Sequence, residues 1–208
     1  MFTQAEYDLM IADDECIGSG CYGEVYRFGT MAIKVGHLVV DDGDQPEQET
    51  LKEANRVGVG PKLICPGHML DKHFGMFAMQ YVMGRHPSKL GHTADELYAI
   101  ALELIEQQIK LLSVDLFHVD LHNENVIVKG DKVTIIDMGG IVKCETDIPL
   151  SAVYGFLGDL EDCYYFRYKS AVKIDHFEYV PIPLVIEFLR DIKNRATIGN
   201  PVKELVTA

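Results

Sequence analysis

A glycine-rich turn between two strand-like runs constrains the fold of this chain more than any other feature of its sequence. The stretch reads C16-I-G-S-G-C-Y-G-E-V-Y-R-F-G-T-M-A-I-K-V-G36. β-branched and aromatic residues follow the glycines, and a second apolar run, M31-A-I-K-V35, comes after a short turn. In a dinucleotide-binding fold these glycines would open a helix. The order therefore predicts antiparallel strands joined by tight turns.

The next segments predict one helix and two further strands. An acidic loop leads into a helix over residues 45–57, with Asp44 as a candidate N-cap and Pro46 in the first turn. Apolar residues recur there at three-residue intervals, at Leu51, Ala54 and Val57. The further strands are predicted over residues 62–65 and 74–83.

The clearest helix begins after Thr93, which forms a capping box with Glu96. Its buried stripe comprises Leu97, Ile100, Ala101, Leu104, Ile105, Leu111 and Leu112. Two short strands, residues 125–128 and 133–136, follow across a K-G-D-K turn. Later helical segments are predicted around residues 157–168 and 183–192.

Composition argues against several classes of function. With 208 residues, 48% of them hydrophobic and 25% charged, the chain is expected to form one globular domain. A formal net charge of -13 argues against general affinity for nucleic acid. No apolar stretch is long enough to cross a membrane and the N-terminus shows no leader pattern, so we expect a cytoplasmic protein. Scattered cysteines without a C-x-x-C pair predict reduced thiols, with neither a disulfide framework nor a zinc site: Cys16, Cys21, Cys65, Cys144 and Cys163.

The glycine turn also has the spacing of a phosphate-binding loop. Gly18, Gly20, Gly23 and Val25 fit G-x-G-x-x-G-x-V, in which glycines let backbone N–H groups approach a polyphosphate and the valine covers an adenine ring. A plain tight turn is the alternative. M31-A-I-K34, one strand later, matches V-A-I-K except at its first residue, and it favours the phosphate loop.

Lys34 lies in an apolar strand, where a cation is costly to bury without a partner. It either faces water on an edge strand or grips the α- and β-phosphates of ATP while a helix carboxylate holds it. The glycine loop favours the second reading. Glu47 faces the apolar side of its helix but could instead complete a capping box with Asp44. Glu49 and Glu53 are the other candidates for the pair.

A second group of polar residues lies at the tips of the two short strands. Asp120 and Asn125 stand five positions apart, and Asp137 ends the following strand, which matches H-x-D-x-x-x-x-N and then D-x-G. Phosphoryl transfer needs positioned charge of this kind. Asp120 would accept the proton of the attacking hydroxyl, while Asn125 and Asp137 would hold Mg²⁺.

Two histidines border this loop. We expect His118 to support the loop without reacting. His118 and His122 could bind a metal with Asp120 if they lay on a helix, but Asn123 and Asn125 beside β-branched runs argue against a helix here.

In this order, the motifs over residues 17–139 resemble those of the protein-kinase-like superfamily. The resemblance implies an α+β, bilobal fold: an antiparallel N-lobe sheet with one helix and a reduced, mainly helical C-lobe. It implies one domain over residues 1–208, with an N-lobe at about 1–82, a hinge at about 80–92 and a C-lobe at about 93–208. It also implies nucleotide-binding roles for Ile17 beside the glycine loop, for Met79 as gatekeeper, for Gln80, Tyr81 and Val82 as hinge, and for Ala32 and Ile127 as walls of the adenine pocket.

Some positions depart from the pattern of eukaryotic protein kinases. Val119 replaces the arginine that reads a phosphorylated activation loop, and His122 replaces a lysine common in serine/threonine kinases. No A-P-E follows Asp137, and only about 70 residues remain after it. These features are similar to RIO kinases, aminoglycoside and choline phosphotransferases and other small atypical kinases, including compact phage and bacterial effector kinases. Asp159 or Asp162 would brace the catalytic loop, or else lie at a solvated helix end.

Three functions remain open on this basis. The first is an ATP- and Mg²⁺-dependent Ser/Thr protein kinase, with a protein substrate as its partner. The second is a small-molecule kinase with an acidic and aromatic pocket. Candidate residues for that pocket are Glu161, Asp162, Tyr164, Tyr165 and Asp175. The third is a kinase-like binding module without activity, although Lys34, Asp120, Asn125 and Asp137 are all present.

Overall fold

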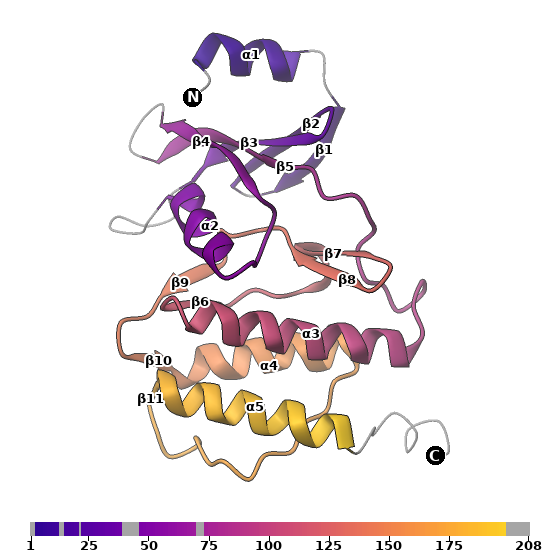
Figure 1. Ribbon diagram of the computed structural model, residues 1–208, viewed down its shortest axis with the longest axis vertical. Helices are drawn as coiled ribbons and strands as arrows, with labels where there is room; N and C mark the ends of the chain where they lie inside the picture. Colours follow the sequence, from indigo (N-terminus) through magenta and orange to yellow (C-terminus); the bar gives the residue numbers. More distant parts are fainter. Residues whose placement is uncertain (1–2, 13–14, 21, 39–45, 70–72, 199–208) are drawn as a thin grey trace. The chain divides into compact units, whose positions relative to one another are not determined.

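The computed structural model describes residues 3–12, 15–20, 22–38, 46–69 and 73–198, which form an α+β protein of two compact units (Figure 1). The first unit comprises Met1–Met83 together with Thr134–Gly139. The second comprises Gly84–Val133 and Gly140–Ala208. The short segment Thr134–Gly139, which lies about two-thirds of the way along the chain, thus belongs to the first unit.

A five-stranded antiparallel sheet forms most of the first unit. Its strands are β1 (Glu15–Gly20), β2 (Gly23–Phe28), β3 (Met31–His37), β4 (Leu63–Met69) and β5 (Phe74–Gln80), in the order β1-β2-β3-β5-β4. Gly20 pairs with Gly23 at the tip of the β1–β2 hairpin. The prediction that the glycines join antiparallel strands is confirmed.

The described residues of this unit form two helices, where the sequence predicted one. α1 (Gln4–Ala12) begins at a reciprocal capping arrangement between Thr3 and Glu6. Tyr7 anchors it by packing into a buried cluster with Ile33, Cys65, Met76 and Ala78. The helix was missed because no apolar stripe marks it, although T3-Q-A-E6 is a capping-box signature.

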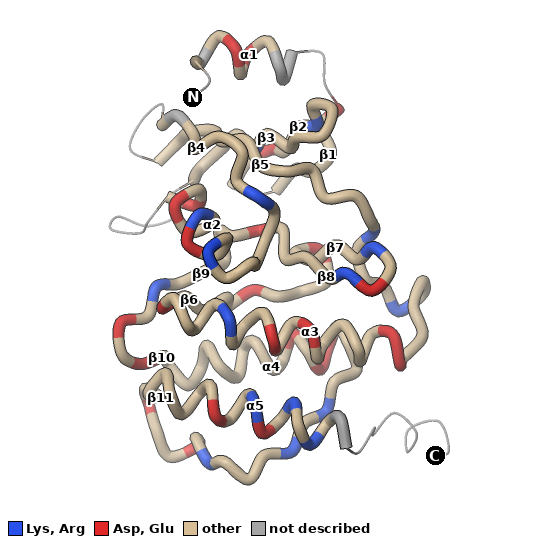
Figure 2. The backbone as a smooth tube through the Cα atoms, in the orientation of Figure 1, with Lys and Arg blue, Asp and Glu red and all other residues tan. Residues whose placement is uncertain are grey.

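α2 (Glu47–Arg56) is the predicted helix, but its start differs from the prediction. Pro46 occupies the N-cap position, and no side chain caps the first turn. The proposed N-cap Asp44 lies outside the described residues. Leu51 and Ala54 are fully buried on the inner face of the helix. Figure 2 shows acidic and basic residues interspersed along α2.

The second unit is mainly helical. Its helices are α3 (Ala94–Leu112), α4 (Leu150–Tyr164) and α5 (Ile182–Ile198), with a 3₁₀ turn, η1, at Asn123–Asn125. Its short strand pairs are β6 (Leu116–His118) with β9 (Ile141–Lys143), and β10 (Asp147–Pro149) with β11 (Tyr179–Pro181). β7 (Val126–Lys129) and β8 (Lys132–Ile135) form a further two-stranded sheet, and the boundary between the two units falls within β8, after Val133.

The capping box of Thr93 and Glu96 at the start of α3 is confirmed. α4 differs from its predicted range, 157–168, because it starts after the extended Pro149 and ends where Tyr165 turns left-handed at φ 56°. Lys193 of α5 pairs with Glu106 of α3 at 2.6 Å, across the side of the helical layer. In the part of the chain that is described, no helix is long and apolar enough to span a membrane.

Candidate active site

Lys34 lies at the centre of a buried charge cluster in the first unit. It is 8% exposed on β3, between Val25 of β2 and Phe77 of β5 in the sheet register. Its Nζ lies 2.8 Å from Oε1 and 2.7 Å from Oε2 of Glu47, and 3.0 Å from Oδ1 of Asp137. Lys34 therefore does not face water, and two carboxylates compensate its charge.

Of the three candidate carboxylates on α2, Lys34 pairs with Glu47, which is 4% exposed. Glu49 pairs with Lys52, and Glu53 pairs with Arg56, each three residues along the exposed side of the helix. Position on the inner face therefore decides the partner, as the apolar pattern of α2 indicated.

Burial and mutual attraction oppose each other in this cluster. Burial alone would lower the pKa of the Lys34 ammonium, but the carboxylates of Glu47 and Asp137 raise it above its ordinary value. Burial raises the pKa of Glu47 to about 7, although the neighbouring Lys34 acts in the opposite direction. The cluster thus holds a charged lysine beside one fully buried and one partly exposed carboxylate.

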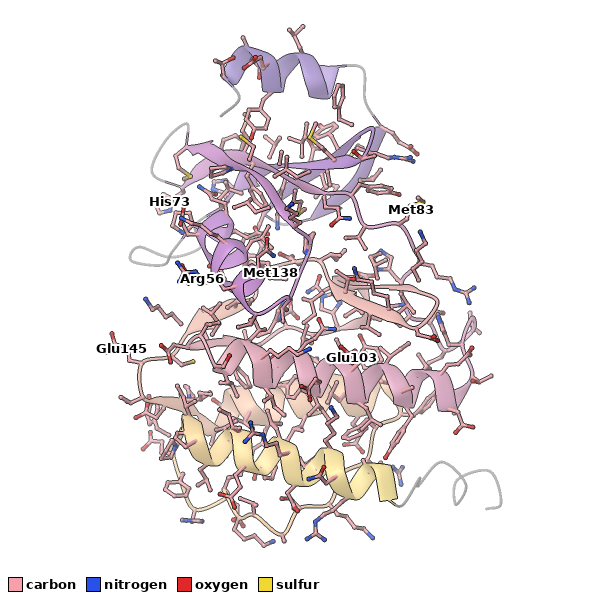
Figure 3. All side chains as sticks on the ribbon, viewed as in Figure 1. Arg56, His73, Met83, Glu103, Met138 and Glu145 are labelled. Atoms are coloured by element: carbon pink, nitrogen blue, oxygen red, sulfur yellow. The ribbon has the colours of Figure 1, made fainter. Side chains whose placement is uncertain are left out.

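The D137-M-G139 segment attaches to this cluster through its backbone and side chains. Gly139 donates its N–H to Oδ1 of Asp137 at 2.9 Å. Met138, labelled in Figure 3, is 1% exposed and lies against Gly60 in the first unit. The buried methionine therefore fixes the segment while the Asp137 side chain stays 36% exposed.

The three loop glycines differ in what surrounds them. A Cβ at Gly20 would meet nothing within 4 Å, and at Gly18 only Val25, at 3.8 Å. At Gly23, with φ +154°, it would lie 2.3 Å from the carbonyl oxygen of Val35. Gly23 is thus required by the packing of β2 on β3, whereas Gly18 and Gly20 leave open space beside the backbone. Ile17 is 39% exposed at an irregularity in the β1–β2 register.

The backbone N–H groups of the predicted hinge differ in whether they are already hydrogen-bonded. The N–H of Gln80 donates to the carbonyl oxygen of Lys62 and that of Tyr81 to the carbonyl oxygen of Thr30, so neither N–H is free to donate to an adenine ring. Among the described residues, the N–H of Val82 has no hydrogen-bond partner. Met79 of β5 pairs with Ala32 of β3, and the two residues are buried, at 6% and 4% exposure respectively. Ile127 lies on β7 in the second unit, 9% exposed.

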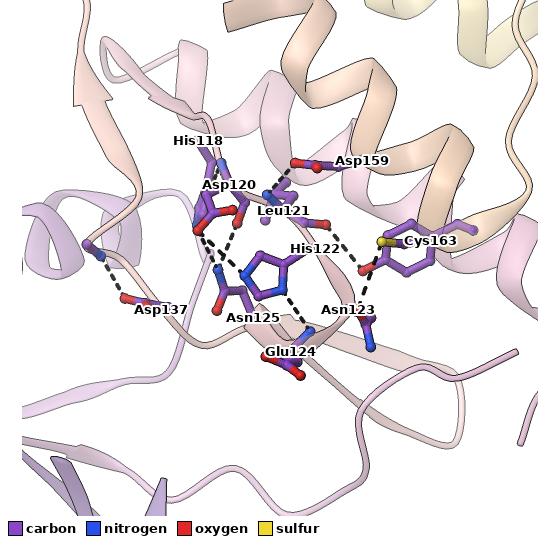
Figure 4. Close-up of polar contacts among 12 residues, drawn as sticks. His118, Asp120, Leu121, His122, Asn123, Glu124, Asn125, Asp137, Asp159 and Cys163 are labelled. Carbon is purple, nitrogen blue, oxygen red and sulfur yellow. Dashed lines mark hydrogen bonds and ion pairs between the residues drawn. The ribbon is translucent and has the colours of Figure 1, made fainter. Parts of the chain in front are cut away.

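His118, Asp120 and Asn125, the polar residues of the predicted catalytic loop, come together in the second unit, as Figure 4 shows. Nδ2 of Asn125 donates to the carbonyl oxygen of Asp120 at 2.9 Å and to its Oδ2 at 3.2 Å. His118 is fully buried, and its Nδ1 accepts the N–H of Asp120 at 3.2 Å. His118 thus supports the loop, as predicted. The described residues contain no cluster of three or more His, Cys, Asp or Glu side chains able to bind a metal.

Asp159 of α4 braces the same loop. Its Oδ2 accepts the N–H of Leu121 at 3.0 Å, and Tyr164, one turn later, donates its hydroxyl to the Leu121 carbonyl at 3.4 Å. Burial raises the pKa of Asp159, against the opposite effect of the Leu121 N–H. Asp162 is exposed. Of the two candidates, Asp159 is therefore the brace, and the fully buried Tyr164 cannot line a substrate pocket.

The sequence matches the model of the RIO domain over residues 45–162, more than half of the chain. This chain belongs to the RIO-domain family. The match runs from α2 into α4 and includes Glu47, Asp120, Asn125 and Asp137. In this RIO domain, the glycine loop and Lys34 precede the matched residues, so their assignment depends on the geometry described above. A search of curated proteins found no match.

Solved kinase structures share the fold of this RIO domain. WbdD, in a co-crystal with the kinase inhibitor LY294002, is 14% identical with a TM-score of 0.54, over 85% of this chain and 44% of the WbdD chain. The kinase PK-1 of Cydia pomonella granulovirus is 14% identical with a TM-score of 0.56, over 84% and 79%. The chain thus spans less than half of WbdD, and the likeness establishes a bilobal kinase fold.

The brace on the catalytic loop of this RIO domain can be tested by Asp159→Ala. We expect a loss of about 1 to 3 kcal/mol in the free energy of unfolding, because the Leu121 N–H, on a fully buried residue, loses its acceptor. Chemical denaturation followed by circular dichroism measures it. Asp162→Ala, an exposed aspartate of the same helix, is the control and should change stability little. Equal effects of the two substitutions would contradict the brace.

Proposed function

We propose that this RIO-domain protein is an ATP- and Mg²⁺-dependent phosphotransferase that acts on serine or threonine hydroxyls of a protein substrate. The observation that carries the proposal is the Lys34, Glu47 and Asp137 cluster, in which a buried ammonium is held by two carboxylates far apart in sequence. Such a cluster costs desolvation energy, and fold stability alone does not require it. The intact Asp120 and Asn125 pair supports the same function.

The residues present fit both groups that the reaction needs. Open space beside Gly18 and Gly20 leaves room for phosphates at the backbone N–H groups. Nδ2 of Asn125 donates its hydrogen bonds to Asp120, so the side-chain oxygen of Asn125 is left to bind a cation. That oxygen in the second unit and the Asp137 carboxylate in the first are each of the ligand type that Mg²⁺ prefers, and Mg²⁺ takes few ligands from protein. When bound, Mg²⁺ would neutralise charge on the phosphates.

Each side chain then has one task. Lys34 binds phosphate oxygens through its ammonium, and Glu47 keeps that ammonium in place. The N–H of Val82 donates to the adenine ring, and the ring contacts apolar side chains that include Ala32 and Met79. Asp120 accepts the proton of the attacking hydroxyl at Oδ1, because its Oδ2 already accepts from Asn125.

The experiment is incubation of the purified protein with Mg²⁺ and labelled ATP, alone, with a generic protein substrate and with small hydroxylated compounds. We expect label on serine or threonine of protein, and a mass increase of one phosphoryl group by intact-mass analysis. If label appeared only in a small compound, the acceptor would be a small molecule and not a protein. Absence of both ATP binding and label with every acceptor would overturn the proposal.

The glycine loop gives a matched pair of variants. Gly20→Ala should keep the wild-type fold but weaken ATP binding about ten- to hundredfold, because a methyl group enters the space left for phosphate. Gly23→Ala should destabilise the sheet by about 1 to 3 kcal/mol, because its Cβ collides with the Val35 carbonyl. Calorimetry and thermal denaturation separate the two effects. Unchanged ATP affinity in Gly20→Ala would contradict the phosphate-loop assignment.

A further inference from the structure

His122 occupies an unusual place in the catalytic loop. It immediately precedes η1, the turn that carries Asn125, and its Nδ1 accepts the N–H of Glu124 at 3.2 Å as the N-cap of that turn. On the other side of the ring, Nε2 lies 3.6 Å from Oδ2 of Asp120. Figure 4 shows the ring between Asp120 and the backbone of Glu124. One imidazole thus contacts both sides of the loop.

The cap determines the tautomer of the ring. A backbone N–H can only donate, so Nδ1 must present its lone pair to Glu124. The proton of the neutral imidazole is therefore on Nε2, the atom next to the Asp120 carboxylate. At 3.6 Å the contact is too long for a hydrogen bond, but it places a donor beside one carboxylate oxygen. Such contacts tighten in catalytic sites when substrate is bound.

Both neighbours of the carboxylate act on the same oxygen. Asn125 donates to Oδ2 of Asp120 at 3.2 Å, and His122 approaches the same atom. Among the described residues, Oδ1 of Asp120 has no hydrogen-bond partner. The Asp120 side chain is 54% exposed, so these contacts, and not packing, restrict its rotation. Oδ1 is thereby the oxygen left to take a proton.

We propose that His122 is a positioning residue, which caps the turn that carries Asn125 and directs Oδ1 of Asp120 toward the acceptor hydroxyl. The inference rests on the proposed function for its catalytic consequence, and on the geometry alone for the tautomer and the contact. It explains why a histidine suits this position, where the sequence pattern of many kinases has a lysine. A lysine has no acceptor for the Glu124 N–H.

Two substitutions separate the two contacts of His122. His122→Asn keeps an N-cap acceptor for Glu124 but has no atom at the place of Nε2. His122→Ala removes both. We expect His122→Asn to unfold as the wild type does, with an unchanged KM for ATP and a kcat about ten- to hundredfold lower. His122→Ala should lose at least as much kcat and also unfold more readily. A wild-type kcat in His122→Asn would overturn the proposal.

Nuclear magnetic resonance tests the geometry without any substrate. Long-range ¹H–¹⁵N spectra of the wild type should show His122 protonated on Nε2 alone, and the ¹³C signal of the Asp120 carboxyl should shift in His122→Asn. A proton on Nδ1, or an unmoved Asp120 signal, would overturn the positioning role. Absence of turnover in the wild type would count against the proposed kinase function, and these spectra would still decide the inference.

Discussion

Asp120→Asn will leave a folded protein whose phosphoryl transfer is at least about a hundredfold slower than that of the wild type, the range in which a positioned general base contributes. The amide has nearly the shape of the carboxylate, so the contacts of Asp120 with Asn125 and His118 can largely persist. It cannot take up the proton of the attacking hydroxyl. The rate of label transfer to protein, with ATP affinity measured separately, checks this expectation.

Asp131→Asn is the matched control for that substitution. Asp131 is exposed in the turn between β7 and β8. Its substitution replaces a carboxylate by an amide, as Asp120→Asn does, in the same unit. Its transfer rate should equal that of the wild type. Comparable rates in Asp120→Asn and wild type would remove Asp120 from the reaction, and loss of ATP binding in Asp120→Asn would indicate a disturbed loop.

Lys34→Met will destabilise the first unit by about 3 to 5 kcal/mol, because the buried Glu47 carboxylate loses the cation that compensates it. Urea denaturation at constant pH measures the difference. Lys52→Met is the control, since Lys52 is 53% exposed and pairs with Glu49 at the surface. An exposed pair of that kind contributes at most about 1 kcal/mol. Equal losses of stability in the two variants would show that burial of the Lys34 pair does not increase its contribution to the free energy of unfolding.

The defect of Lys34→Met should also grow with pH. Burial already raises the pKa of Glu47 to about 7, and without the attraction of Lys34 it rises further. Between its ordinary pKa and this raised value, the folded variant holds a proton that the unfolded chain has released, so the free energy of unfolding falls as pH rises. The variant should thus lose more stability at about pH 8 than at about pH 6. Lys34→Met with Glu47→Gln should recover much of the loss at the higher pH, and failure to do so would assign the defect to another contact.

Local signals in the sequence predicted the parts of the fold that depend on neighbouring residues. The glycine hairpin and the capping box of Thr93 and Glu96 are examples, because spacing alone determines them. The pairing of Lys34 remained open among three glutamates until the sheet and α2 were placed together. The choice of Asp159 over Asp162 required the distance to Leu121, which α4 sets across 38 residues of chain.

Other features depend on contacts that sequence patterns do not record. The hinge prediction named three residues. The N–H groups of two of them, Gln80 and Tyr81, already donate to the carbonyl oxygens of Lys62 and Thr30. α1 places one aromatic side chain, Tyr7, in the buried cluster, and a single residue gives no periodic signal. The sequence offered His122 as a replacement for lysine or as a metal ligand, because its cap on Glu124 appears only with the turn geometry.

Residues Thr134–Gly139 have a practical consequence for anyone who wishes to dissect this protein. Because these six residues belong to the first unit, while the chain on either side of them belongs to the second, neither unit is a single continuous stretch. A fragment that ends at Met83 would lack Asp137 and the buried Met138, and the complementary fragment would carry them without Lys34. Separate expression of the halves would therefore yield two incomplete cores, and only co-expression or full-length variants preserve the ammonium with both of its carboxylates.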